Sequence, residues 1–536
     1  MRSWGSRLTR PAQSSEVNFE IDSGLAQRFA ALSAGDSIAI GEQNFAAGLN
    51  FLRVWQTFAQ SAAAGASLDF FGIAEIPLQD DDLSAQLALR PELGAQADAL
   101  LACWRRRVPG WNRWHFCDGR VRLTLVISGV EEALEEVRGI DVWLGTGPAQ
   151  VHAPSLARRT PASALVIGGG IAGCAAAHAL ALRGIAVTLL ERAPTLASAA
   201  SGNPRGILHA RFGAGMNPQQ RFVLAAYGHA LALLDQTLPV DGVARAECGL
   251  LQLGFSEREA TRIERLLALD WPPHLLQRVN AAQASTLAGI ELQQGGLWFP
   301  AGGWVAPPLW CARLADHPGI VQRVARDVEI LAATGSGWRV SGHNAQQGVW
   351  LADAEIVVVC CAQQALRLQQ FAHFPLSAVR GQITELPATP ASATLRAVVC
   401  ADGYVTPAQN GSHLTGATHS LDDESIAVRA ADHAENIARL KTHFQELHRA
   451  LGEIDVAELE GRAAVRCSAP GSMPLVGEVL PHLYCSLAHG TRGLLTAGIA
   501  GELIAAAACG QLLPLPTSVI AALDPQMRKQ FRNTGG

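Results

Sequence analysis

Three glycines between Ala164 and Glu191 have the spacing of a nucleotide-binding turn. Gly168, Gly170 and Gly173 follow a short apolar run, and Glu191 ends the next apolar run. In such a G-x-G-x-x-G turn, the first glycine permits the tight turn, the second lets the backbone approach a pyrophosphate, and the third lets the following helix pack closely. Glu191 stands where an acidic residue accepts hydrogen bonds from ribose hydroxyls. The pattern predicts dinucleotide binding.

The surrounding elements fit this interpretation. Residues 165–167 read as a buried parallel strand, 171–183 as an Ala-rich helix ended by Gly184, and 185–190 as a second strand. A phosphate would sit on the free N–H groups at the start of the helix, near Ile171. After Glu191, a loop of small residues and turn formers is suited to lie along a long cofactor.

A second glycine turn lies near the C-terminus. His489 to Gly493 follows an apolar run at 483–487 and precedes a long apolar segment from Leu494, which predicts strand, turn and helix. The N-terminus of that helix would place positive partial charge beside an anionic ring or carboxylate. The segment 494–509 is short and contains Glu502, so it reads as a buried helix and not as a membrane span.

Composition narrows the class of protein. The 536 residues are 49% hydrophobic, which allows two or three domains with large cores, and the net charge of −5 gives no sign of a globally basic nucleic-acid binder. The 11 cysteines are scattered without a C-x-x-C pair, which favours a reducing cytoplasm over a disulfide framework. The first residues lack the apolar stretch of a secretory signal, and no pattern indicates a metal site.

The chain divides at a Gly-, Pro- and Arg-containing linker. We expect an N-terminal α/β domain at 1–150, a linker at 151–163, and a second domain at 164–536. Further strands at 320–331, 338–341 and 356–360 could extend the nucleotide sheet, whereas those at 379–386, 397–401 and 413–418 suggest an antiparallel sheet. The second domain is therefore expected to contain two interleaved parts.

The motifs of the second domain resemble those of the FAD-dependent amine-oxidising oxidoreductases of the D-amino-acid and glycine oxidase type. They are GGGIAG with Glu191, ASGNPRG, Val379 to Gln382, Arg466 before PLVG, and HGTRGLL. More specifically, ASGNPRGIL, QQGGLWFPAGGWV, ADGYVTP and AVRCSAPGSMPLVG are similar to the oxidoreductase half of the bifunctional enzymes of tRNA 5-methylaminomethyl-2-thiouridine biosynthesis. This resemblance covers about residues 162 to 525.

The resemblance implies an α/β fold of the D-amino-acid oxidase type, in which a Rossmann-like FAD-binding domain is interleaved with an antiparallel-sheet substrate domain. The expected FAD-binding parts are about 164–235, 300–370 and 461–525, and the substrate-domain parts about 236–299 and 371–460. FAD is the implied cofactor. Its expected contacts are Gly168, Gly170, Ile171, Gly173, Glu191, Arg192, Ala200, Ser201, Gly202, Arg205, Gly206, Gly490, Thr491, Arg492, Gly493 and Leu494.

The implied substrate is the carboxymethylaminomethyl group on a wobble uridine in the anticodon region of tRNA. Hydride loss from its N–CH₂–COO⁻ unit gives an imine, which water splits into glyoxylate and a primary amine. The carboxylate needs a fixed cation, for which Arg466 is the candidate, and Tyr404 is a candidate substrate hydrogen-bond partner. Each residue could instead have a purely structural role: Arg466 could form an ion pair, and Tyr404 could pack in the sheet.

The N-terminal part resembles the S-adenosylmethionine-dependent methyltransferase half of the same enzymes, with losses. The family's loop glycines fall on Asn44 and Ala46, its ribose-binding acid falls on Ala74 with Glu75 displaced by one, and its active-site Asp is missing near Gly145. The later part of that half is absent. We therefore expect a truncated, inactive remnant that does not bind S-adenosylmethionine.

Two other functions remain open at this point. A small-molecule glycine, sarcosine or D-amino-acid oxidase would need the flavin and Arg466 but no tRNA surface. A flavin-binding scaffold whose chemistry has lapsed would bind the flavin but would need neither Arg466 nor Tyr404 to contact a substrate. No DNA or membrane partner is expected, and the oligomeric state cannot be inferred from the sequence.

Overall fold

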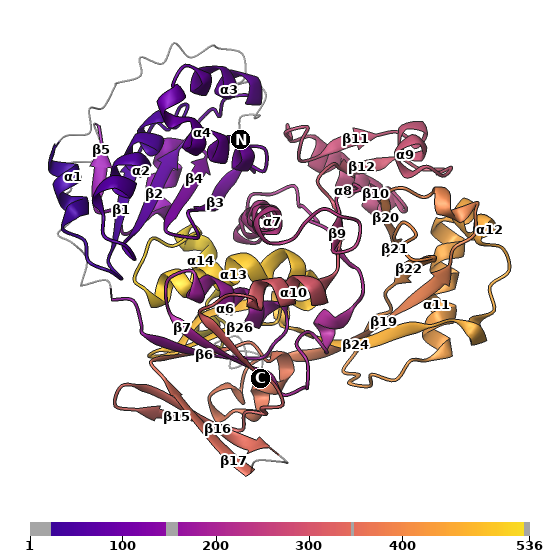
Figure 1. The fold of residues 1–536 in the computed structure, drawn as a ribbon. Helices are drawn as coiled ribbons and strands as arrows, with labels where there is room; N and C mark the ends of the chain where they lie inside the picture. The colour runs from indigo at the N-terminus through magenta and orange to yellow at the C-terminus, as the bar shows by residue number, and fades with distance from the viewer. Residues whose placement is uncertain (1–22, 146–158, 345–347, 530–536) are drawn as a thin grey trace.

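The computed structural model describes residues 23–145, 159–344 and 348–529. Within these ranges the strands form one five-stranded, one six-stranded and one nine-stranded sheet, together with two three-stranded sheets. Figure 1 shows the N-terminal sheet at upper left, the nine-stranded sheet at right and the six-stranded sheet at lower centre. Most of the predicted linker at 151–163 lies outside the described residues.

The N-terminal domain is an α/β sheet in the order β3-β4-β2-β1-β5, parallel except for the β3–β4 pair. One face packs on the domain's own helices, whereas Phe71, Ile73 and Val126 on the other face share a core with helices of the second domain. The elements are β1 (Ser37–Glu42), β2 (Ser67–Ile73), β3 (Gly110–Phe116), β4 (Val121–Ile127), β5 (Val142–Leu144), α1 (Ser23–Ala30), α2 (Leu49–Ser61), α3 (Asp80–Ala88), α4 (Gly94–Trp104) and α5 (Val130–Glu136).

The six-stranded sheet has the order β14-β7-β6-β18-β26-β25 and is parallel except at β25. Its two central strands consist mainly of buried apolar residues, as expected for strands covered on both faces. The strands are β6 (Ser163–Ile167), β7 (Ala186–Leu190), β14 (Ile320–Arg323), β18 (Ile356–Val359), β25 (Leu475–Leu480) and β26 (Leu483–Leu487). The helices of this part are α6 (Ile171–Ala181), α7 (Pro218–Thr237), α10 (Pro307–Ala315), α13 (Gly493–Ala508), α14 (Thr517–Leu523) and α15 (Pro525–Lys529).

The nine-stranded sheet is mostly antiparallel and is built from segments far apart in the sequence. Its order is β11-β12-β10-β20-β21-β22-β19-β23, and β24 also pairs with β19. Its strands are β10 (Leu250–Leu253), β11 (Gln277–Val279), β12 (Gly296–Phe299), β19 (Ser377–Pro387), β20 (Val398–Ala401), β21 (Gly403–Val405), β22 (Ser412–Gly416), β23 (Ser420–Leu421) and β24 (Gly461–Ser468). Its helices are α8 (Glu257–Leu267), α9 (Ala281–Ala288), α11 (Ala430–His443) and α12 (Gln445–Leu451). Thus β24 lies in this sheet, although the expected division counts residues from 461 with the FAD-binding parts.

Two small sheets complete the fold. The first contains β8 (Gly206–Leu208), β13 (Gly303–Val305) and β9 (Arg245–Ala246). The second contains β15 (Ile330–Thr334), β16 (Gly337–Asn344) and β17 (Gly348–Ala354). The prediction that residues 338–341 and the end of 320–331 extend the nucleotide sheet is therefore wrong. Only residues 320–323 join that sheet, whereas residues 330–331 and 338–341 pair with their sequence neighbours in a separate, largely exposed meander.

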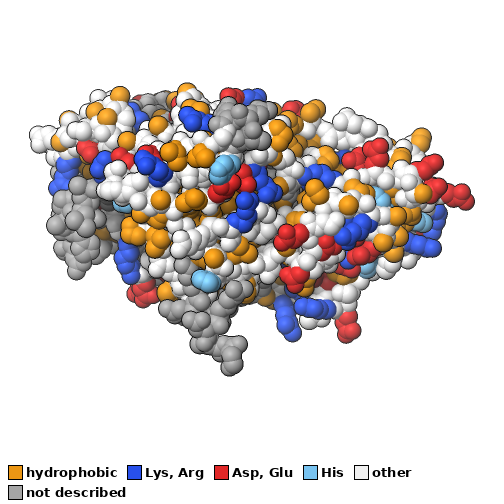
Figure 2. Space-filling view, turned by 90° about the horizontal axis from the view of Figure 1, so that it is seen from below, with side chains coloured by type: hydrophobic (Ala, Val, Ile, Leu, Met, Phe, Trp, Pro, Cys, Tyr) orange, Lys and Arg blue, Asp and Glu red, His pale blue; other side chains and the backbone are white. Residues whose placement is uncertain are grey.

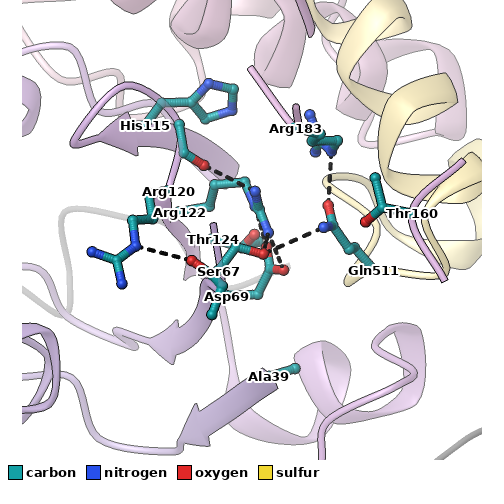
Figure 3. A network of polar contacts seen from close by, with 12 residues as sticks. Ala39, Ser67, Asp69, His115, Arg120, Arg122, Thr124, Thr160, Arg183 and Gln511 are labelled. Atoms are coloured by element: carbon teal, nitrogen blue, oxygen red, sulfur yellow. Dashed lines mark hydrogen bonds and ion pairs between the residues drawn. The ribbon is translucent and has the colours of Figure 1, made fainter. Parts of the chain in front are cut away.

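A buried polar network joins the N-terminal domain to the second domain. Asp69 on β2 accepts bonds from Arg113 at 2.8 Å and from Arg122 at 2.9 Å, and all three side chains are buried. Figure 3 shows the network continuing from Arg122 through Ser67 to Gln511 and then to Arg183. A second branch runs from Arg113 to Glu502 of α13, which also accepts a bond from Arg183 at 2.8 Å.

The surface carries both signs of charge. On the face seen in Figure 2, acidic and basic side chains are interspersed, in keeping with the net charge of −5. In the described part of the chain, no helix combines the length and hydropathy needed to cross a bilayer.

Candidate functional site

A cavity of about 1080 Å³ runs from the glycine turn after β6 to the inner face of the nine-stranded sheet. This exceeds the roughly 300–1,000 Å³ of typical small-molecule sites, so it has room for an extended ligand. Of the sequence-predicted site residues, the following line it: Gly168, Gly170, Ile171, Glu191, Arg192, Ala200, Ser201, Gly206, Tyr404, Arg466, Gly490, Thr491, Arg492, Gly493 and Leu494.

The turn between β6 and α6 keeps a helix N-terminus open toward the cavity. Gly168 has a φ of +109°, and a Cβ atom there would lie 2.8 Å from the backbone oxygen of Cys360. Gly170 is the N-cap of α6 and has no side chain with which to cap the helix, and of the first N–H groups that of Ile171 donates to the Ser201 hydroxyl. Uncapped N–H groups and the helix dipole together favour an anion such as a pyrophosphate.

Glu191 and the loop after it complete this end of the cavity. One carboxylate oxygen of Glu191 accepts from the N–H of Gly169 at 2.6 Å, and the other accepts from that of Ala193 at 2.8 Å. The hydroxyl of Ser201 accepts from the N–H of Ile171 at 3.0 Å. The carboxylate is thus fixed at the end of β7, beside the glycine turn.

The second glycine turn begins α13. Residues 490–492 form a short 3₁₀ turn, and α13 starts at Gly493 without a side-chain cap. His489 has hydrogen-bond partners on both ring nitrogens, Ser486 at 2.9 Å and Thr496 at 2.8 Å, which supports a structural role. The cavity therefore meets two helix N-termini, neither of which is capped by the side chain of its own N-cap residue.

Arg466 and Tyr404 reach the cavity from the nine-stranded sheet. Arg466 on β24 is paired in register with Val379 on β19, and its guanidinium occupies the space that a Cβ atom at Gly381 would need. Among the described residues, Arg466 has no hydrogen-bond or ion-pair partner. Burial lowers the pKa of Arg466 and raises the pKa of Tyr404 to about 12, and the two groups interact electrostatically. A cation and a neutral phenol therefore face the same space.

Three of the predicted cofactor contacts, Gly173, Gly202 and Arg205, do not line the cavity. Gly173 packs under the turn, where a Cβ atom would overlap the backbone oxygen of Gly168, which is the role expected of the third glycine. Gly202 lies against Arg462, which holds the loop by bonds to the backbone of Ser198 and to other loop atoms. Neither glycine lines the cavity.

Arg205 departs from the prediction of direct cofactor contact. Its buried guanidinium donates to the backbone oxygens of Pro407 at 2.9 Å and Ser412 at 3.0 Å, and it does not line the cavity. These partners lie about two hundred residues later in the chain, so local sequence could not reveal them. Arg205 instead ties the cofactor loop to the nine-stranded sheet.

Two further polar residues line the cavity and were not singled out as site residues. Gln252 lies in the middle of the otherwise apolar strand β10, and His209 follows β8. The Nε2 atom of His209 is buried without a hydrogen-bond partner among the described residues, and burial lowers its pKa to about 4. The signal for Gln252 was present in the sequence as a single amide among leucines.

The N-terminal domain retains the outline of a nucleotide turn without its glycines. Ala46, in the loop between β1 and α2, has a φ of +42°, a conformation that favours glycine. Ala74 after β2 is buried, whereas the displaced Glu75 is exposed. The acid is thus not held where the family's ribose contact is expected.

Comparison with known proteins first defines the class. The family model "FAD dependent oxidoreductase" matches residues 163–507. Among solved structures, glycine oxidase from Geobacillus kaustophilus superposes with a TM-score of 0.57 at 22% identity, covering 67% of this chain and 97% of that chain. L-proline dehydrogenase from P. horikoshii gives a TM-score of 0.54 at 18% identity, covering 70% and 98%. The chain is an FAD-dependent oxidoreductase, and its fold is of the D-amino-acid oxidase type.

Curated relatives then identify the family. The bifunctional protein MnmC of tRNA 5-methylaminomethyl-2-thiouridine biosynthesis from Nitrosospira multiformis is 49% identical over 94% of this chain and 92% of its own length. The protein of the same name from Chromobacterium violaceum is 36% identical over 94% and 91%. The chain belongs to the MnmC family. The first alignment is 570 positions long, more than the 536 residues of this chain, so parts of that relative have no counterpart here.

The residues present fit FAD. Its pyrophosphate matches the glycine cradle at α6, where side chains are excluded by the close approach of backbone, and the pyrimidine end of its flavin, which carries negative charge when reduced, matches the N-terminus of α13. The cavity is continuous between these two turns. The remaining space on the side of the nine-stranded sheet contains Arg466 and Tyr404.

Proposed function

We propose that this protein oxidatively removes the carboxymethyl group from 5-carboxymethylaminomethyl-(2-thio)uridine at the tRNA wobble position. The products are the 5-aminomethyl nucleoside and glyoxylate. The proposal is carried by one observation: the Arg466 guanidinium faces the cavity beside Tyr404 and has no partner within the described structure. A half-buried cation that faces a cavity without a counter-ion is costly, so an anionic substrate group is the fitting partner.

The roles of the chain's own residues follow from their positions. Arg466 would bind the substrate carboxylate with its two-pronged guanidinium and so fix the adjacent CH₂ group. Tyr404, kept neutral by its raised pKa, would donate a hydrogen bond to the substrate. When bound, FAD supplies the acceptor for the hydride lost from that CH₂ group. The substrate nitrogen must be neutral to form the imine, and hydrolysis of the imine releases glyoxylate.

The cofactor-binding residues proposed from the sequence divide into two groups. The turn at 168–171 with Glu191 and the loop 200–206 would hold the dinucleotide's adenosine and pyrophosphate. The turn at 490–494 would present N–H groups to the flavin pyrimidine end and stabilise negative charge there. Gly173, Gly202 and Arg205 would act indirectly, by packing and by holding the loop.

We further propose that residues 1–150 are a truncated methyltransferase domain without activity. Support comes from Ala46 in a glycine-type conformation and from the exposed Glu75. Isothermal titration with S-adenosylmethionine should give no binding heat, and tight binding would contradict the proposal. With tRNA as the substrate, the protein would act in the cytoplasm.

The experiment is incubation of the purified holoprotein with tRNA that carries the carboxymethylaminomethyl modification, followed by nucleoside mass analysis. We expect the 5-aminomethyl nucleoside to appear together with glyoxylate. Turnover of free glycine or sarcosine alone would favour a small-molecule oxidase. Purification without any flavin, or flavin without turnover of either substrate, would favour a lapsed scaffold.

A further inference from the structure

Gln252 is a buried amide at the inner face of the nine-stranded sheet. It is 4% exposed and lies between Leu251 and Leu253, which are also buried. Its Nε2 makes one long hydrogen bond, 3.4 Å, to the backbone oxygen of Leu253. From the described residues, no donor reaches its Oε1. Because a polar atom left unpaired in a buried setting costs about 1–3 kcal/mol, the unpaired Oε1 in the cavity wall is suited to accept from a ligand.

The register of the sheet places Gln252 in line with Tyr404. Gln252 on β10 is paired with Cys400 on β20, and Cys400 is paired with Tyr404 on β21. Paired residues project from the same face, and all three line the cavity. With neighbouring strands about 4.8 Å apart, the backbones of Gln252 and Tyr404 are about 10 Å apart. The side chain between them is the small Cys400 thiol, which burial keeps neutral by raising its pKa to about 12.

His209 borders the same end of the cavity. Its ring meets that of Phe299 edge-on at 5.7 Å, and Phe299 is paired with Leu250, two residues before Gln252 on the same strand face. Its buried Nε2 also has no partner among the described residues. Arg466 marks a cationic end of the substrate space, whereas Gln252 and His209 present polar groups that carry no charge. Arg211, which also lines the cavity, is ion-paired with Glu259 at 2.8 Å.

This distribution of charge fits a ligand with an anionic head and a neutral, hydrogen-bonding ring. A side-chain amide offers a donor and an acceptor side by side, and the N3–H and O4 of uracil offer the complementary pair. Enzymes that act on a single base read its Watson–Crick edge in this way after it leaves the stack. We propose that Gln252 is a specificity-determining residue that pairs with the N3–H and O4 edge of the uracil ring. This inference rests on the proposed function and adds a base-reading contact to it.

The test compares three substrates in the holoenzyme. They are an anticodon stem-loop with the modified uridine, the same stem-loop methylated at uracil N3, and N-ethylglycine, which has the reacting group but no ring. For the unaltered protein we expect kcat/KM to fall about 10- to 100-fold on N3-methylation. Gln252→Leu should lose a similar factor on the first stem-loop and no longer distinguish the two, while N-ethylglycine oxidation changes less than about twofold.

Gln445→Leu, at an exposed glutamine of α12, is the matched control and should retain the discrimination. FAD content and melting temperature report folding, and if Gln252→Leu does not fold, Gln252→Glu replaces it. That isosteric variant loses the donor to O4 and should raise KM for the stem-loop only. Discrimination that survives in the variant, or equal loss on all three substrates, would overturn the role of Gln252. Failure of the unaltered protein on both stem-loops would overturn the proposed function itself, and the role of Gln252 with it.

Discussion

At the scale of single residues, the cavity is defined by where side chains are missing as much as by where they are present. Gly381 leaves room for the guanidinium of Arg466. Gly168 lets its own turn lie close to the backbone of Cys360. The glycine spacing could be recognised from sequence because its geometry is local. The partners of Arg205 could not, because Pro407 and Ser412 reach it only through the tertiary fold.

Replacing Arg466 tests its proposed role directly. Arg466→Lys keeps the charge but loses the two-pronged geometry, so kcat/KM should fall about 10- to 100-fold, mainly through KM. Arg466→Met should lose at least about 100-fold, with FAD content unchanged. Steady-state kinetics with the modified stem-loop provide the measurement, and Arg313→Lys, at an exposed arginine of α10, is the control. Unchanged KM in both Arg466 variants would contradict carboxylate binding.

At the scale of elements, α6 and α13 are positioned by their close packing on each other. A Cβ atom at Gly501 of α13 would lie 2.8 Å from the backbone of Ala175 in α6. Because both helices begin at the cavity, their separation sets the distance between the two glycine turns. The individual strand and helix patterns were readable in the sequence. The separate β15–β17 meander was not, because apolar runs do not specify which strands will pair.

Gly501→Ala should therefore push the two helices apart. We expect a loss of about 1–3 kcal/mol in the free energy of unfolding from overpacking, together with weaker FAD retention. Thermal denaturation and flavin absorbance after gel filtration measure the two effects. Gly94→Ala, at a helical glycine with open space around it, should be neutral or slightly stabilising. Wild-type stability and flavin content in Gly501→Ala would refute this account of the packing.

At the scale of the whole molecule, the N-terminal domain and the oxidoreductase share one core. A parallel sheet needs cover on both faces, and here the second face of the N-terminal sheet packs with residues of α6, α7 and α13. Composition and motifs indicated two domains, but they could not show that one completes the core of the other. The buried network around Asp69 and Glu502 lies at this junction.

Breaking that network should destabilise the protein without touching the cavity. Asp69→Asn leaves the buried Arg122 without its counter-ion and leaves Arg113 paired with Glu502 alone, which should cost about 3–5 kcal/mol in urea unfolding. The matched control is Asp353→Asn in the exposed pair with Arg339, where the loss should stay below about 1 kcal/mol. Equal effects of the two substitutions would argue against a shared core held by the network.

Acidification should also destabilise the folded state. Burial lowers the pKa of His209 and of His229 to about 4, against about 6.5 in an unfolded chain. Between these values the unfolded state binds more protons, so the free energy of unfolding should fall as the pH drops from 6.5 to 4. Melting temperatures measured across this range provide the check, and His229→Gln should flatten the slope whereas His343→Gln, at an exposed histidine, should not. A melting temperature independent of pH would contradict the burial of these neutral rings.

The central claim is that a carboxymethylamine on a wobble uridine is oxidised in the cavity beside Arg466. The most direct measurement is an anaerobic titration of the flavin-containing protein with modified tRNA, following flavin absorbance and glyoxylate together. We predict bleaching of the oxidised flavin with one glyoxylate released per flavin, and no bleaching with the same tRNA lacking the carboxymethyl group. Bleaching by both tRNAs, or by neither, would contradict the account.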